Sequence, residues 1–214
     1  CIKYVEEVKK RLTKNKTYEK IERIYPEKEK TINKKYVEKN MNVSMPIFAI
    51  GIKDVSKMDS EIVKKHIAIE ILLNLIFGES SDLYKKLYND GVIMSNPSMD
   101  YEFSRGYAFV LLSGQSKDPR KVYEEFKKAV NDIKEKGIVE EDFNRIKKTI
   151  YGDYIKEYND VTDIARMFLS DYFKGINSFD YIEQIGSVNK DYTEQILNEV
   201  FAENKMVLSV INSK

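Results

Sequence analysis

The chain has 214 residues, with 36 Lys and Arg against 35 Asp and Glu, so its formal net charge is only +1. Nucleic acids and anionic membrane surfaces select proteins with a large positive excess, so this balance argues against both as partners. Ten Phe and fifteen Tyr exclude a disordered chain, which could not remain extended with so many aromatic residues. A lone Cys excludes an intrachain disulfide and, because no signal peptide opens the sequence, we expect a cytoplasmic protein.

Residues 1–44 differ in character from those that follow. The stretch 25–42 is mostly Lys, Glu and Asn, which indicates a solvated connector, with a short edge strand near 33–41. Polyanion binding is the alternative for this Lys-rich run, but the interspersed Glu residues favour a linker. The chain begins inside a predicted helix, so we interpret it as a piece of a longer polypeptide. The apolar residues of that helix are Ile2, Val5, Val8 and Leu12.

The first elements after the connector are a strand and a long helix. The apolar run 46–52 predicts an interior strand, and helical spacing predicts a helix over 58–77, capped by Asp59 or Ser60. Its most apolar part, 67–77, is too short for a membrane span, which needs about 20 apolar residues. We therefore expect a buried helix and no membrane segment.

A short helix and a β-hairpin come next. Ser80 or Ser81 caps a helix over 82–88, and Asn-Asp-Gly at 89–91 predicts a turn. Tyr101 and Phe103 alternate on the first arm of the hairpin, which turns at 104–106 and continues over 107–112.

Helices dominate the remainder of the chain. Asp118 and Pro119 predict a helix start, and Gly137 predicts its end. Further helices are expected from about 140, over 179–185 and over 190–201, and 206–211 predicts a closing strand. One more helix ends at Gly175 and carries apolar residues at Val161, Ile164, Ala165, Phe168 and Tyr172. A hairpin implies an antiparallel sheet, so the order predicts an α+β fold with helices on one face.

His66 and Glu70 lie four residues apart on the long predicted helix and share a face. A metal pair is one interpretation, but zinc sites need about three or four ligands, and this chain has one His and one Cys. We favour a hydrogen-bonded pair. Glu70 and Asn74 have the same spacing within an apolar stretch, which predicts a buried polar contact with the sheet or with another subunit.

Other catalytic arrangements receive little support. Ser-His-Asp catalysis would need His66, which lies in a helix, and no Ser has a G-x-S-x-G context. The Gly residues are isolated, so no phosphate-binding loop is predicted. A catalytic carboxylate pair stays open because Asp and Glu are so numerous. Tyr side chains at helical spacing indicate either a peptide-binding surface or half-buried packing with the hydroxyls in water: Tyr151, Tyr154, Tyr158, Tyr172, Tyr181 and Tyr192.

Five stretches, in their order and spacing, resemble one family. They are 45–54 (MPIFAIGIKD), 80–91 (SSDLYKKLYNDG), 106–119 (GYAFVLLSGQSKDP), 139–153 (VEEDFNRIKKTIYGD) and 188–211. The chain resembles the pitrilysin/insulinase family of zinc metallopeptidases, the inverzincins. The lead-in 21–26 (IERIYP) resembles a bacterial branch similar to mitochondrial processing peptidase.

The resemblance implies two homologous α+β halves that face each other like a clamshell. Each half has an antiparallel sheet of about six strands with helices packed on one face. Zinc binds the first half on an H-x-x-E-H helix. This chain resembles the second half, with 1–44 as the terminal helix of the preceding half plus a linker and 45–214 as the C-terminal α+β domain. H-x-x-E-H is absent, so the resemblance implies no catalytic residue, metal ligand or cofactor here, and zinc in the N-terminal half.

The substrate-binding residues of the family match this chain only in part. Many second halves carry an Arg and a Tyr just after the S-S-x-L helix, and these residues hold substrate. Here the Arg position corresponds to Tyr88 and the Tyr position falls near Met94 or Ser95, so the pair cannot be carried over. The candidate substrate-chamber residues are Tyr88, Asn89, Gly91 and Ser95.

The resemblance therefore implies a non-catalytic C-terminal half of a zinc metallopeptidase, inactive when alone. It would form one wall of the peptide chamber, chiefly through 46–52 and the hairpin, and the interface with the zinc-bearing half. Its partners would be that N-terminal half or a homologous subunit, and a peptide substrate; a homodimer is a further option. The alternative is an inactive peptidase homologue that acts as a scaffold or partner subunit. An H-x-x-E-H motif upstream of Cys1 would distinguish the two.

Overall fold

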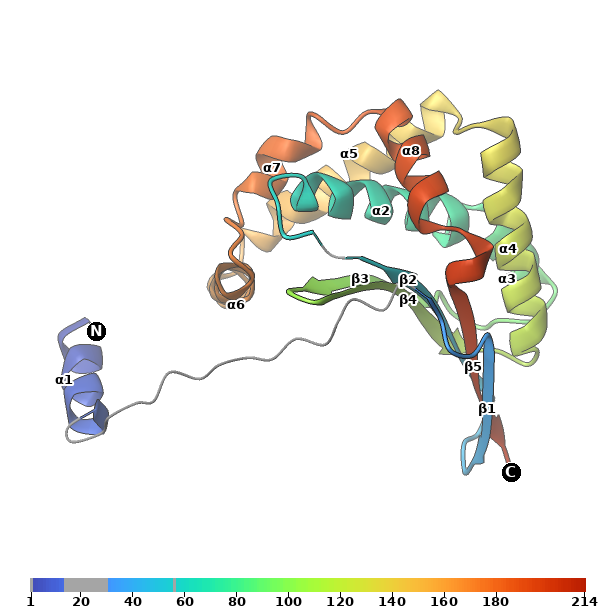
Figure 1. Ribbon diagram of the computed structural model, residues 1–214, viewed down its shortest axis with the longest axis horizontal. Coiled ribbons are helices and arrows are strands. Elements are labelled where there is room, and N and C mark those ends of the chain that lie inside the picture. Colours follow the sequence, from blue (N-terminus) through green and yellow to red (C-terminus); the bar gives the residue numbers. More distant parts are fainter. Residues whose placement is uncertain (1, 14–30, 56) are drawn as a thin grey trace.

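Alternating apolar residues build a sheet with one buried face. The structure is a computed structural model that describes residues 2–13, 31–55 and 57–214. In β2 (Ile47–Asp54) every second residue is buried, and much of β4 (Tyr107–Gln115) and β5 (Met206–Ser213) alternates in the same way. Helices cover the buried face, and none of the described helices covers the other (Figure 1). The predicted α+β class, with helices on one face of the sheet, is confirmed.

Five described strands form the sheet in the order β1-β5-β2-β4-β3, where β1 is Tyr36–Met41 and β3 is Ser98–Ser104. Neighbouring strands are antiparallel except β1 and β5, which are parallel. The expectation of about six strands, all antiparallel, differs in these details from the described part of the chain. The reason is the chain path: β5 inserts between β1 and β2, and the short segment 42–46 reverses the chain direction between them.

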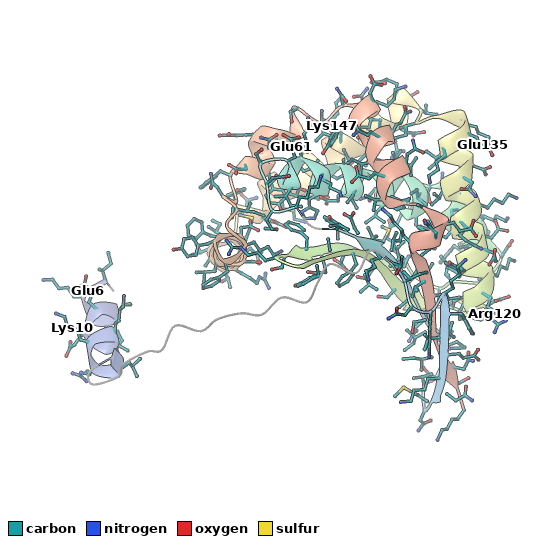
Figure 2. The ribbon with its side chains drawn as sticks, viewed as in Figure 1. Glu6, Lys10, Glu61, Arg120, Glu135 and Lys147 are labelled. Atoms are coloured by element: carbon teal, nitrogen blue, oxygen red, sulfur yellow. The ribbon has the colours of Figure 1, made fainter. Side chains whose placement is uncertain are left out.

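The strand β1 forms one edge of the sheet, as the Lys-rich segment near 33–41 predicts. All six residues of β1 are exposed. Arg120, at the start of α4 (Pro119–Lys136), lies beside this strand (Figure 2). Its Nη2 atom contacts Glu38 Oε2 at 3.4 Å, and its guanidinium lies 4.7 Å from the centre of the Tyr36 ring. Because exposed ion pairs contribute little, backbone pairing with β5 is the main attachment of β1.

The helix α2 (Ile62–Phe77) lies at the centre of the helical layer. It has neighbours on several sides, which explains why its apolar residues are not confined to one stripe. The predicted start near residue 58 is too early, because Asp59 Oδ1 accepts a hydrogen bond from the Glu61 N–H at 3.1 Å in a turn before the helix. The neighbouring helices are α5 (Glu140–Glu157), α7 (Asp180–Ile185) and α8 (Lys190–Val200).

Two other helices begin at the caps that the sequence predicts. Ser81 Oγ accepts a hydrogen bond from the Tyr84 N–H at 3.1 Å at the start of α3 (Asp82–Asn89). Asp118 Oδ1 accepts one from the Lys121 N–H at 2.9 Å at the start of α4. These bonds satisfy backbone donors that a helix leaves free in its first turn.

The helix α6 (Val161–Lys174) differs most from expectation. The helix itself is present, but its predicted apolar stripe does not join the core. Val161 is 81% exposed, Phe168 49% and Tyr172 65%. In Figure 1, α6 lies beyond the hairpin end of β3 and β4, apart from the main helical layer. Local periodicity therefore predicted the helix correctly but not which of its sides faces the rest of the domain.

The opening helix α1 (Ile2–Thr13) is drawn apart from the α+β body in Figure 1. Its apolar residues Ile2, Val5 and Leu12 are exposed. The segment 21–26, which resembles the bacterial branch of the family, lies outside the described residues. Across the described part of the chain, no helix has the length and hydropathy needed to cross a bilayer.

Candidate functional site: the open sheet face and its borders

The uncovered face of the sheet presents small and apolar side chains at its centre. Ala49 and Gly51 point to this face from β2, the middle strand. Gly51 is flanked in register by Leu111 of β4 and Val207 of β5. A Cβ atom added at Gly51 would meet nothing within 4 Å, so the space above it is open. This face is a half-exposed apolar floor over three adjacent strands.

The predicted substrate-chamber residues lie at one end of this sheet. Tyr88 and Asn89 are exposed at the C-terminal end of α3, and Gly91 follows with φ 66°. This left-handed conformation favours glycine. Ser95 is exposed four residues further along the loop. The structure thus brings Tyr88, Asn89 and Gly91 together at one turn and places Ser95 on the same connection to β3.

Several contacts fix this connection to the body. The Lys117 N–H donates to the Val92 carbonyl at 3.0 Å, and the Ser116 N–H donates to the Pro46 carbonyl at 3.0 Å. Asp90 Oδ2 lies 3.1 Å from Lys121 Nζ at the start of α4. The loop after α3 therefore lies where β2 begins and β4 ends. The role of its four candidate residues stays a prediction.

Sequence reasoning missed a second feature, a cavity of about 320 Å³ beneath α6. Its walls come from α2, α5, α6, α7 and β3. Two hydrogen bonds cross it from α2: His66 Nδ1 and the Tyr181 hydroxyl are 2.8 Å apart, and the Tyr154 hydroxyl donates to Glu70 Oε2. Nearby, the Tyr101 hydroxyl donates to buried Asp54 at 2.7 Å.

These contacts correct the expectation of a His66–Glu70 pair. Each side chain bonds a different tyrosine from another helix, and Glu70 contacts α5 instead of the sheet. Asn74 donates to the backbone carbonyl of Glu70 at 3.0 Å and not to its carboxylate. The hydroxyls of Tyr154 and Tyr181 bond buried side chains, so they are not the water-facing groups that helical spacing indicates.

Burial perturbs both α2 groups in the cavity. It raises the pKa of the Glu70 carboxyl to about 7, against the opposing effect of the Tyr154 hydrogen bond. It lowers the pKa of His66 to about 4, with a smaller contribution from Lys174. Both groups are therefore disfavoured in their charged forms. A neutral His66, hydrogen-bonded and surrounded by the rings of Tyr101, Phe103 and Tyr181, is suited to packing.

The described residues contain no cluster of three or more His, Cys, Asp or Glu side chains that could hold a metal ion. The open face offers apolar contact, because the backbone groups of its central strands pair within the sheet. The chemistry of the cavity is neutral hydrogen bonding between helices.

Comparisons with known proteins agree with this arrangement. The family model described as "Peptidase M16 inactive domain" matches residues 2–150. The chain is 24% identical over 196 residues to the zinc protease YmfH of Bacillus subtilis, covering 91% of this chain and 46% of YmfH. It is similar to the solved structure of an M16-like peptidase from Alicyclobacillus acidocaldarius, with a TM-score of 0.87 and 22% identity over 100% of this chain and 52% of that chain. A peptidase M16 inactive domain from Pseudomonas fluorescens gives a TM-score of 0.71 at 11% identity, covering 100% of this chain and 51% of that chain.

The chain spans about half the length of these relatives. The structural matches show that its fold is that of one half of such a protein. The family match covers most of the chain and confirms the resemblance drawn from the sequence. The chain belongs to the M16 family of zinc peptidases, in which it is an inactive domain.

Proposed function

We propose that this domain forms one wall of a peptide-binding chamber in a zinc metallopeptidase whose other half carries out hydrolysis. The observation that carries the proposal is the sheet face that none of the described helices covers, with Ala49, Gly51 and Leu111 at its centre. A sheet of this kind in a soluble protein covers its apolar face with another layer. In a two-half peptidase, this face lines the substrate chamber, and the bound peptide covers it.

The domain would hold substrate through contacts that tolerate many sequences. Apolar residues on the open face contact side chains of an extended peptide. Among the described strands, β3 is an edge strand, and its outer side can add backbone hydrogen bonds, as in other strand-addition complexes. Tyr88, Asn89, Gly91 and Ser95 would border the chamber at the end of the sheet where β2 begins.

Zinc would reside in the other half, on the family's H-x-x-E-H helix, where it activates water and polarises the scissile carbonyl. The contribution of this domain is orientation of the peptide and exclusion of water. Its partner would be the zinc-bearing half, within one polypeptide or as a homologous subunit.

The first test distinguishes a domain that only lines the chamber from a domain that cleaves peptides itself. The isolated chain should bind no stoichiometric zinc, as measured by metal analysis, and should not cleave unfolded peptides. Together with the zinc-bearing half it should cleave them. Cleavage by the isolated chain in the presence of a chelator would contradict the proposal. Absence of H-x-x-E-H from the partner half would instead identify a scaffold.

A substitution tests the sheet face directly. In the assembled enzyme, Leu111→Lys should raise KM for peptide by roughly tenfold, because a charge replaces apolar contact on the chamber floor. The kcat should change less, since the zinc chemistry lies elsewhere. Val139→Lys, at an exposed turn between α4 and α5, is the matched control and should leave both constants unchanged. An unchanged KM for Leu111→Lys would place the peptide elsewhere.

A further inference from the structure

The helix α6 presents a mixed polar and apolar side to the body and its most apolar side to solvent. Met167, Asp171 and Lys174 line the cavity beneath it. The outward side carries a continuous group of large apolar residues, which we call the α6 patch: Val161, Phe168, Leu169, Tyr172 and Phe173. Phe173 is 81% exposed. A contiguous group of this size marks an interaction surface, whereas single exposed apolar residues do not.

The fold does not need this patch to hold α6 in place. Asp160 Oδ1 accepts hydrogen bonds from the N–H groups of Thr162 and Asp163 at the start of the helix. At its end, Ser178 Oγ donates to buried Asp171 at 2.8 Å, and Lys174 Nζ lies 4.6 Å from the centre of the Phe103 ring. These polar contacts orient the helix with its apolar side outward.

The position of α6 suits a partner that also faces the sheet. The contact of Lys174 with Phe103 places the end of α6 against β3, the edge strand opposite β1. Figure 1 shows α6 at the hairpin end of the sheet, outside the main helical layer. Buried Phe103 points to the helix-covered face of β3, so α6 borders that face at the β3 edge. A second body lying against the open face would reach the α6 patch by extending around this edge.

The chemistry of the patch excludes several occupants. The two cations of α6 are engaged: Arg166 pairs with Asp163, and Lys174 lies over the Phe103 ring, so the helix lacks the row of free Lys and Arg that attracts a membrane. A helix has no free backbone groups along its side, so strand addition by a peptide is unavailable. An apolar, uncharged protein surface is the complementary partner.

We infer that the α6 patch is the docking surface for the zinc-bearing half of the peptidase. The inference rests on the proposed function and on the length of the relatives, of which this chain covers about half. The remaining half supplies a body of similar size. The α6 patch would form the apolar contact that fixes the two halves at the rim of the chamber.

Cysteine labelling tests the inference. Phe173→Cys is placed in the chain with Cys1→Ser, and its reaction with a maleimide is compared with and without the zinc-bearing half. We expect complex formation to slow labelling at least tenfold. Val139→Cys, also exposed but at the turn between α4 and α5, should label at the same rate in both states.

The outcomes separate the two proposals. If the halves co-elute while Phe173→Cys labels at full rate, the α6 surface is not the interface, and the chamber function stands. If the halves do not associate, both proposals fall. If labelling slows in the isolated chain as its concentration rises, the occupant is a second copy, and the inference is overturned.

A second variant measures the strength of the contact. Phe168→Ser combined with Phe173→Ser should raise the Kd for the zinc-bearing half at least tenfold, because central aromatic residues dominate binding. Its thermal midpoint should match that of the unmodified chain, since both side chains are exposed. An unchanged Kd would contradict the inference. Val139→Ser serves as the control.

Discussion

At the scale of single residues, Glu70 and His66 give the domain two opposing pH responses. Glu70 keeps a proton in the folded state that the unfolded chain releases, so stability falls as pH rises from about 4.5 to about 7. In the folded state His66 stays unprotonated at pH values where the unfolded chain binds a proton there. Stability therefore falls as pH drops from about 6.5 to about 4. The two effects partly cancel where their ranges overlap.

Glu70→Gln should separate these responses. The variant removes the cost of ionising a buried carboxyl and keeps an acceptor for the Tyr154 hydroxyl. One pKa unit corresponds to about 1.4 kcal/mol. Between pH 4.5 and pH 8 the free energy of unfolding of the variant should therefore rise by up to about 3 kcal/mol relative to that of wild type. Urea unfolding at both pH values measures this gain. Exposed Glu79→Gln should follow wild type, and a Glu70→Gln profile parallel to wild type would disprove the assignment.

At the scale of elements, the cap of α3 positions the predicted chamber residues at its other end. Ser81→Ala removes the acceptor for the Tyr84 N–H and should lower stability by about 1 kcal/mol. Ser80→Ala is the control, because Ser80 is exposed and its hydroxyl only accepts a hydrogen bond from Arg145. The midpoint of thermal unfolding should be lower for Ser81→Ala than for wild type, and nearly equal to that of wild type for Ser80→Ala. Equal losses would mean that the cap does not stabilise α3.

Local signals in the sequence located most elements, and distant contacts explain the rest. Ser81 and Asp118 act through backbone groups three residues away, so their roles follow from the sequence. The partners of Glu70 and His66 lie 84 and 115 residues away, beyond any local pattern. The same limit applies to α6, whose spacing predicted a helix but not the direction of its apolar side. The candidate residues near Tyr88 came from family resemblance and await a test.

At the scale of the whole molecule, the last strand, β5, lies inside the sheet and joins β1 to β2. The sequence predicted β5 as a strand, but its place between β1 and β2 depends on pairings across most of the chain. Buried Met206, Leu208 and Val210 pack against the helical layer from this strand. The opening helix α1 has the opposite character, because its apolar residues remain exposed in the described structure.

Two terminal truncations should therefore have opposite results. Removal of 206–214 takes away an internal strand, leaves β1 without its partner among the described strands and exposes one edge of β2, so the chain should lose its cooperative unfolding transition. Removal of 1–13 should change the stability of the α+β body by less than about 0.5 kcal/mol, because substitutions at exposed sites have effects of that size. Urea unfolding followed by circular dichroism measures both. A large loss on removing 1–13 would show that α1 packs on this domain; an unchanged midpoint agrees with a helix that belongs to the zinc-bearing half.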